Sequence, residues 1–232
     1  MARSAFLDPS EVRAVYRRRA KRYDFTANLY YLIGFRETHF RRAAVAALAL
    51  NAGDTVVEIG CGTGLNCSLL QRAIGPNGRI VGVDLAAEML TVARARIQKE
   101  GWRNVDLVES SAAAFEFPAG VDGVLSTFAL TLEPDYAEVR QRAASALTPG
   151  KRFVLLDLRL PQNWLRYLAP LFVLIVQPFA VSLEVAKRRP WESVARYFTN
   201  PTYRALYFGF AYIATGEAPW PHGQSPREMK QL

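Results

Sequence analysis

A strand that ends in an acidic residue and enters a glycine-rich turn constrains the fold of this chain more than any other feature. Residues 56–64 read VVEIGCGTG and residues 81–84 read VGVD, with a helical pattern between them. Glycine lets the backbone turn tightly and approach a ligand where a Cβ atom would collide. A carboxylate at the end of the next strand can accept both hydroxyls of a ribose. The pattern therefore predicts a β-α-β unit that binds a nucleoside.

The spacing of the glycines separates this loop from those that bind dinucleotides. Gly60, Gly62 and Gly64 give G-x-G-x-G, whereas dinucleotide loops read G-x-G-x-x-G. Glu58 precedes the glycines and Asp84 ends the next strand. Two acids and three glycines in this order are a far more specific pattern than the glycines alone.

Strand-like and helix-like segments alternate after this motif. Strands are expected at 55–59, 79–83, 105–108, 123–126 and 152–158, with helices at 65–74, 86–99 and 134–147, and a turn at 148–150 before the fifth strand. Such alternation predicts a parallel sheet covered by helices. Residues 203–214 are rich in aromatic and β-branched side chains and predict one late strand, while residues 27–50 predict a helix broken near Gly34.

Length and composition favour one α/β domain with additions. A chain of 232 residues, half of them apolar, can bury a full core but is short for two independent domains. The two cysteines, Cys61 and Cys67, have no histidine nearby and predict neither a disulfide framework nor a zinc site. No signal peptide is apparent, so a cytoplasmic location is expected, with peripheral attachment to the inner face of the membrane.

Basic residues are concentrated near the start of the chain. Residues 1–42 contain ten Lys or Arg and four acids, which accounts for six of the net +8 charges. Val12, Tyr16, Ala20 and Tyr23 share one face of a predicted helix whose other faces are basic. The asymmetry indicates an anionic partner, either a membrane surface or nucleic acid, and the alternative is a solvated basic helix face.

The most apolar stretch, residues 168–181, is about fourteen residues long and contains two prolines. It is short of the ~20 residues that a spanning helix needs. A buried helix that covers the sheet is favoured over an interfacial segment that receives a greasy substrate. The expected organisation is a basic helical cap at 1–50, a main domain at 51–216 with an apolar insertion at about 160–200, and a flexible tail at 217–232.

The motif EIGCGTG followed by GVD resembles the cofactor loop of class I S-adenosylmethionine-dependent methyltransferases. The resemblance extends over about residues 10–215. It implies a Rossmann-like α/β fold, with a mostly parallel seven-stranded sheet, helices on both faces and an N-terminal helical cap. It also implies S-adenosyl-L-methionine as cofactor, and no metal.

The resemblance assigns cofactor roles to matching positions. The glycines would allow close approach of the methionine and ribose, Glu58 would orient the loop, Asp84 would accept the ribose hydroxyls, and Leu85 and Met89 would lie against the adenine. Many of these enzymes have Gly-Asp-Ala after the third strand, where the aspartate accepts from the adenine amino group, but here Ser111 stands in its place. The full set of expected cofactor residues is Glu58, Gly60, Cys61, Gly62, Gly64, Asp84, Leu85, Met89, Ser110, Ser111, Ser126 and Thr127.

Methyl transfer needs proximity and orientation rather than a metal or a covalent enzyme intermediate. Aromatic faces stabilise a cation that gains methyl groups, and related enzymes close the N-terminal segment over the cofactor. Tyr23 and Tyr16 are therefore catalytic candidates. Thr131 is a third, because the resemblance places the methyl donor and acceptor near residues 126–131, after the fourth strand. Tyr31, Arg36 and Tyr212 are the candidates for contact with the acceptor.

Two branches of the family offer different acceptors. Residues 23–36, 128–135 and 206–212 look most similar to N-methyltransferases of betaine-lipid synthesis, which predicts a membrane-lipid amine as acceptor. The alternative is a C- or O-methyltransferase of a quinone or another hydrophobic small molecule. Ubiquinone and menaquinone C-methyltransferases, however, usually carry an Arg-Asn pair where this chain has Leu130 and Thr131. A non-enzymatic module that binds nucleic acid through its basic N-terminus is a third reading, although no RNA-binding motif is present.

Overall fold

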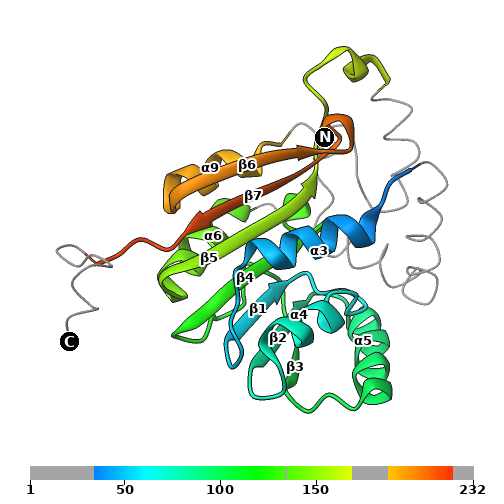
Figure 1. The fold of residues 1–232 in the computed structure, drawn as a ribbon, viewed down its shortest axis with the longest axis vertical. Helices are drawn as coiled ribbons and strands as arrows, with labels where there is room; N and C mark the ends of the chain where they lie inside the picture. Colours follow the sequence, from blue (N-terminus) through cyan, green and yellow to red (C-terminus); the bar gives the residue numbers. More distant parts are fainter. Residues whose placement is uncertain (1–33, 134, 169–187, 222–232) are drawn as a thin grey trace, which may run out of the picture.

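The computed structural model describes residues 34–133, 135–168 and 188–221 (Figure 1). The expected basic helix near the start, most of the apolar stretch at 168–181 and most of the tail lie outside these residues. Within the described ranges, the chain forms one sheet with helices packed on both of its faces.

The sheet has seven strands in the order β3-β2-β1-β4-β5-β7-β6. The first five strands pair in parallel, and β7 runs antiparallel to both β5 and β6. This confirms the mostly parallel, Rossmann-like α/β fold expected from the sequence. The strands are β1 (Thr55–Ile59), β2 (Arg79–Asp84), β3 (Val105–Glu109), β4 (Val121–Thr127), β5 (Leu147–Leu158), β6 (Thr199–Leu206) and β7 (Ala211–Glu217).

Helices cover the sheet in two layers. α3 (Glu37–Ala47) and α4 (Cys67–Ile74) pack on one face, α6 (Tyr136–Ala146) and α9 (Pro190–Tyr197) pack on the other, and α5 (Ala87–Glu100) lies along β2 and β3 (Figure 1). Short 3₁₀ turns follow β4, β5 and β6, at η3 (Leu130–Leu132), η4 (Trp164–Leu168) and η6 (Tyr207–Gly209). No helix of the described ranges has the length and apolar character needed to cross a bilayer.

The two cores follow from the alternation of side chains along buried strands. In β5, Phe153 and Leu155 face α6 and α9, whereas Val154 and Leu156 face α3 and α4, and all four are fully buried. The central strands therefore read as continuous apolar runs, because each of their faces is covered.

The predicted turn at 148–150 is wrong, because these residues are part of β5. β5 pairs with β4 at Leu147 opposite Val121, and again from Arg152 opposite Gly123 onward. The register shift between these pairs is a β-bulge that absorbs the extra residues. Glycine at residue 150 permits this bulge, because residue 150 has φ +79° and a Cβ atom there would lie against the ring of Trp220.

The single strand predicted at 203–214 is also wrong, because a tight reversal divides this segment into β6 and β7. Tyr207, Phe208 and Gly209 have φ values of 44°, 56° and 94°. Left-handed backbone is uncommon for aromatic residues, and the unbroken apolar pattern conceals the reversal. Gly209 was the one local signal for a turn.

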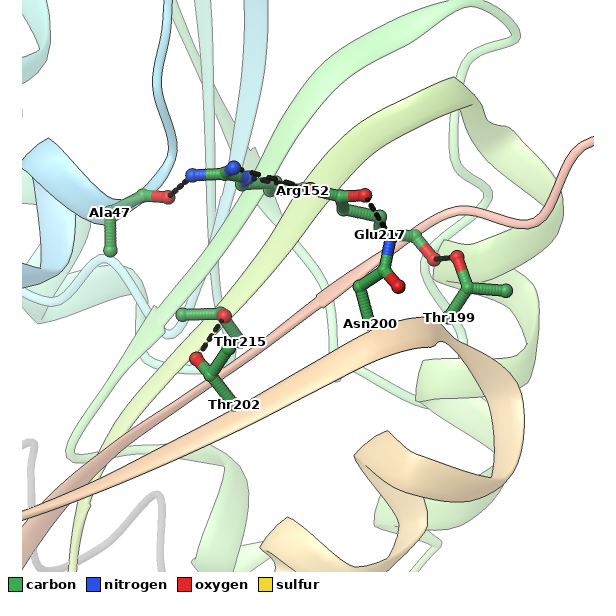
Figure 2. Close-up of polar contacts among 7 residues, drawn as sticks. All are labelled: Ala47, Arg152, Thr199, Asn200, Thr202, Thr215 and Glu217. Atoms are coloured by element: carbon green, nitrogen blue, oxygen red, sulfur yellow. Dashed lines mark hydrogen bonds and ion pairs between the residues drawn. The ribbon is translucent and has the colours of Figure 1, made fainter. Parts of the chain in front are cut away.

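Polar contacts tie the antiparallel edge to the rest of the sheet (Figure 2). Arg152 donates to the carbonyl of Ala47 at the end of α3 (3.2 Å) and pairs with Glu217 of β7 (3.2 Å). Glu217 in turn accepts from Asn200 of β6 (2.8 Å), and the hydroxyls of Thr202 and Thr215 lie 2.6 Å apart.

At the opposite, amino end of the parallel strands, Lys151 joins two segments. Its Nζ lies 2.9 Å from Asp54, before β1, and 3.1 Å from Asp122 in β4. One ammonium group thus connects the starts of three neighbouring strands.

Candidate functional site

A cavity opens at the carboxyl ends of β1, β2 and β4, where open α/β sheets bind their ligands. Its empty volume is about 940 Å³, including the part open to solvent. The lining comes from the glycine loop after β1, residues 83–86 with Met89, two residues of the loop after β3, residues 127–130 and 132–133, and Arg41 of α3. Most of this lining is apolar, as is usual for small-molecule sites.

The glycine loop is built for close packing. Gly60 has φ +69°, and a Cβ atom on it would lie 2.1 Å from Cβ of Ala129, in the loop after β4. A side chain at residue 60 would therefore push apart the two loops that form the cavity. Gly64 has φ +74° and faces the Cys67 thiol, so it seats the loop on α4 rather than lining the cavity.

Asp84 organises the loop from the adjacent strand. One carboxylate oxygen accepts from the Gly62 N–H (2.8 Å) and the other from the Ala86 N–H at the start of α5 (2.9 Å). Burial raises the pKa of Asp84, while these two bonds lower it. A carboxylate has about four acceptor sites, so acceptance from ribose hydroxyls is compatible with both backbone bonds.

Glu58 lies behind the cavity in a buried polar network. Its Oε1 accepts from Asn66 Nδ2 (2.6 Å), which also donates to Thr127 Oγ1 (2.9 Å). Burial raises the pKa of Glu58 to about 7, and the Asn66 hydrogen bond lowers it in part. Among the described residues, Glu58 Oε2, Asn66 Oδ1 and Ser126 Oγ are buried without a hydrogen-bond partner. None of these three residues lines the cavity, so they support the wall that Thr127 forms.

Arg41 and Phe128 were missed by the sequence analysis. Arg41 pairs with Glu37 (2.7 Å), donates to Thr127 Oγ1 (2.7 Å) and lines the cavity. Phe128 lines it too, with φ 57° and its ring 5.3 Å from the Arg41 guanidinium. The i, i+4 spacing of Glu37 and Arg41 was the available sequence signal for Arg41. No local sequence pattern indicates the role of Phe128.

The structure gathers most of the expected cofactor residues. Gly60, Cys61, Gly62, Asp84, Leu85, Met89, Ser110 and Thr127 all line the cavity. Glu58, Gly64, Ser111 and Ser126 do not, and the Ser111 Oγ accepts from the Ala114 N–H (3.1 Å) instead. Burial raises the pKa of the Cys61 thiol well above its usual value, so this thiol is a neutral part of the wall.

Thr131 and Tyr212 come together, but away from the cavity lining. The Thr131 hydroxyl donates to Asp157 Oδ2 (2.5 Å), and Tyr212 is opposite Asp157 in the β5–β7 ladder. Tyr212 is fully buried and packs edge-on against Trp191, with ring centroids 5.0 Å apart. Arg36 is exposed just before α3, and Tyr16, Tyr23 and Tyr31 lie outside the described residues. No group of three or more potential metal ligands occurs in the described ranges.

Comparisons with known proteins agree with this geometry. Residues 56–150 match the methyltransferase domain family. A demethylmenaquinone methyltransferase of Lactococcus lactis is 31% identical over 106 residues, covering 45% of this chain and 42% of the relative. One of Listeria welshimeri is 28% identical over 143 residues, covering 57% of this chain and 61% of the relative. The chain thus matches about half the length of these curated relatives.

Solved structures share the fold at lower identity. A Haloferax volcanii chain solved with a methyltransferase activator has a TM-score of 0.67 at 18% identity, covering 92% of this chain and all of that one. Phosphoethanolamine N-methyltransferase 2 of Haemonchus contortus has a TM-score of 0.63 at 17% identity, covering 78% of this chain and 52% of that one. The described residues therefore have the fold of class I S-adenosylmethionine-dependent methyltransferases, and residues 56–150 resemble the methyltransferase domain family.

Proposed function

We propose that this chain transfers a methyl group from S-adenosylmethionine to a ring carbon of a quinone precursor. The observation that carries the acceptor is the run of demethylmenaquinone methyltransferases among its relatives, matched over 106 to 147 residues. The sequence analysis favoured a lipid amine as the acceptor over a quinone, and this proposal reverses that preference. The apolar wall after β4, formed by Phe128, Leu130 and Leu132, suits a hydrophobic acceptor.

The chain's contribution to such a reaction is position rather than covalent chemistry. S-adenosylmethionine supplies an electrophilic methyl group on its sulfonium. Asp84 would hold the ribose, Thr127 would lie near the methionine amine with Glu58 and Asn66 behind it, and Arg41 would stand beside the methionine carboxylate. Residues 127–132 would exclude water around the acceptor, and this orientation supplies much of the rate enhancement expected for methyl transfer.

A lipid amine is the second candidate acceptor. Leu130 and Thr131 replace the Arg-Asn pair usual in the quinone enzymes, and this departure favours the amine branch. In the structure Thr131 is engaged with Asp157 through both its hydroxyl and its N–H (2.5 and 3.1 Å). It is therefore a positioning residue for the loop after β4 in this proposal.

We also infer that the chain attaches to an anionic membrane surface, where hydrophobic acceptors reside. The basic excess of residues 1–42 supports attachment. So do three aromatic side chains on the described surface: Trp164, Tyr167 and Phe208 are 71%, 72% and 74% exposed. Asn163 Nδ2 donates to the Phe208 carbonyl (3.3 Å), which links the two loops that carry them.

A methyl-transfer assay with labelled cofactor tests the acceptor. Demethylmenaquinol, a lipid extract containing diacylglyceryl-homoserine, and RNA are offered in parallel, and product is identified by mass spectrometry. We expect label on the quinol ring with the wild-type chain and strongly reduced label with Asp84→Ala. Label on the lipid head group alone would establish the amine candidate instead, and label on RNA alone would refute both.

A further inference from the structure

The loop after β3 brings no carboxylate to the cavity lining for the amino group of an adenine. Ser110 lines the cavity, but its hydroxyl donates to the Ser111 carbonyl (3.0 Å). The Ser111 hydroxyl accepts from the Ala114 N–H (3.1 Å) and does not reach the lining. Both serines are thus held by hydrogen bonds within their own loop, and neither supplies the negative charge of the aspartate that is common at this place in similar enzymes.

An apolar slot next to Asp84 has the character of a purine site. Leu85, Met89, Ala112, Leu130 and Leu132 contribute to the same lining. A base whose ribose is held by Asp84 would lie among these side chains, with its faces covered. Its exocyclic amino group would then be desolvated, and leaving such a donor unpaired costs binding free energy.

Glu133 brings a carboxylate to this part of the lining. Among the lining residues of the described chain, only Asp84 and Glu133 carry one; Asp84 accepts from two backbone N–H groups, whereas Glu133 accepts from the backbone N–H of Asp135. Glu133 is half-buried, and burial raises its pKa. It follows η3 directly, so its place is fixed by the loop after β4.

Two arginines hold Glu133 beside the loop after β3. Arg188 Nη1 donates to the carbonyls of Thr131 (2.8 Å) and Glu133 (2.9 Å), which fixes the backbone at this point. Arg142 of α6 donates to the carbonyls of Ala112 (3.1 Å) and Phe115 (3.2 Å), and its positive charge acts on the Glu133 carboxylate. Arg142 therefore stands between the loop after β3 and Glu133.

We propose that the Glu133 carboxylate recognises the exocyclic amino group of the adenine and replaces the aspartate missing after β3. This inference rests on the proposed function, since it assumes that the cavity takes S-adenosylmethionine. It assigns base specificity to the loop after β4, the same loop that faces the acceptor. Glu133 is a specificity-determining residue in this scheme, with no part in the transfer of the methyl group.

Calorimetry with two ligands tests this assignment. S-adenosylhomocysteine carries the amino group, whereas S-inosylhomocysteine carries a carbonyl oxygen in its place. The wild-type chain is expected to prefer the adenosyl ligand at least about tenfold, the effect of one hydrogen bond to a charged group. Glu133→Gln should lose about tenfold in affinity for the adenosyl ligand and gain for the inosyl one, because its amide N–H can donate to that oxygen.

Glu138→Gln is the matched control, since Glu138 lies on the first turn of α6 and does not line the cavity. It should keep wild-type affinity and preference. Glu133→Ala is a second variant and should lose the preference without reversing it; thermal unfolding checks that each variant folds. Wild-type preference in both Glu133 variants would overturn the inference, even if turnover fell. Absence of binding by the wild-type chain would instead refute the proposed function.

Discussion

At the scale of single residues, Gly60 shows how closely the cofactor loop depends on its neighbour. Its missing side chain is what allows the loop after β1 to touch Ala129 in the loop after β4. Two effects are therefore combined at this position: a backbone conformation that disfavours a Cβ atom and a contact that excludes one.

Gly60→Ala should abolish measurable binding of S-adenosylhomocysteine, because the new methyl group must displace the loop after β4. It should also lower the free energy of unfolding by about 1–3 kcal/mol. Gly101→Ala is the control, since Gly101 has a similar φ of +71° but nothing within 4 Å of an added Cβ. Calorimetry and thermal unfolding separate the two effects. Equal binding by both variants would contradict the role given to the Gly60–Ala129 contact.

Glu58 makes stability depend on pH. Its pKa rises from 4.5 to about 7 in the folded chain because it is buried. Between these values the folded state holds a proton that the unfolded state has released, so stability falls as pH rises through this window. Glu58→Gln keeps the shape of the side chain and removes the titration.

The Gln variant should therefore gain stability relative to wild type between pH 5 and pH 8, by an amount on the order of 2–3 kcal/mol. Urea unfolding at the two pH values measures this change. A difference between variant and wild type that is the same at both pH values would show that Glu58 titrates normally.

At the scale of elements, the parallel part of the sheet follows from the sequence and the antiparallel edge does not. Strands β1 to β4 lie close to their predicted positions because each has an apolar run bounded by turn residues. β6 and β7 were predicted as one strand because the reversal between them uses left-handed backbone at Tyr207 and Phe208, inside a continuous apolar pattern.

Eight of the twelve expected cofactor residues line the cavity, because they lie at or just after the carboxyl ends of the parallel strands. Arg41 and Glu133 were not predicted, because only the tertiary fold brings them to the cavity; the spacing of Glu37 and Arg41 indicates an ion pair but not its place.

The edge hairpin should be stabilised by the contact between Arg152 and Glu217. A double-mutant cycle with Arg152→Ala and Glu217→Ala should give a coupling free energy of about 0.5–1 kcal/mol, modest because the pair is partly exposed (40% and 26%). The Arg79–Asp106 pair, exposed by 57% and 55%, is the reference cycle and should couple more weakly. Equal coupling in the two cycles would mean that the hairpin pair is no better than a surface pair.

At the scale of the whole molecule, the exposed aromatic side chains follow the carboxyl ends of β5 and β6, which lie at the same end of the sheet as the cavity. Trp164→Ser combined with Phe208→Asn should weaken sedimentation with anionic vesicles at least about tenfold, because each aromatic ring contributes roughly 1.5–3 kcal/mol when buried. Asn is chosen at residue 208 since it tolerates left-handed backbone. Trp102→Ser, before β3 on the opposite edge of the sheet, is the control. Unchanged sedimentation of the double variant would remove these loops from the membrane proposal.

The Lys151 contacts carry a consequence for how such a protein diverges. Asp54, Asp122 and Lys151 join three strands at their amino ends, whereas the cavity lies at the carboxyl ends of the strands and is lined mostly by the loops there. Mutations in those loops can accumulate without breaking the ion pairs of Lys151. A residue that recognises the ligand can therefore be replaced by one in another loop during evolution. A glutamate after β4 that takes over from an aspartate after β3 is the kind of drift that this division permits.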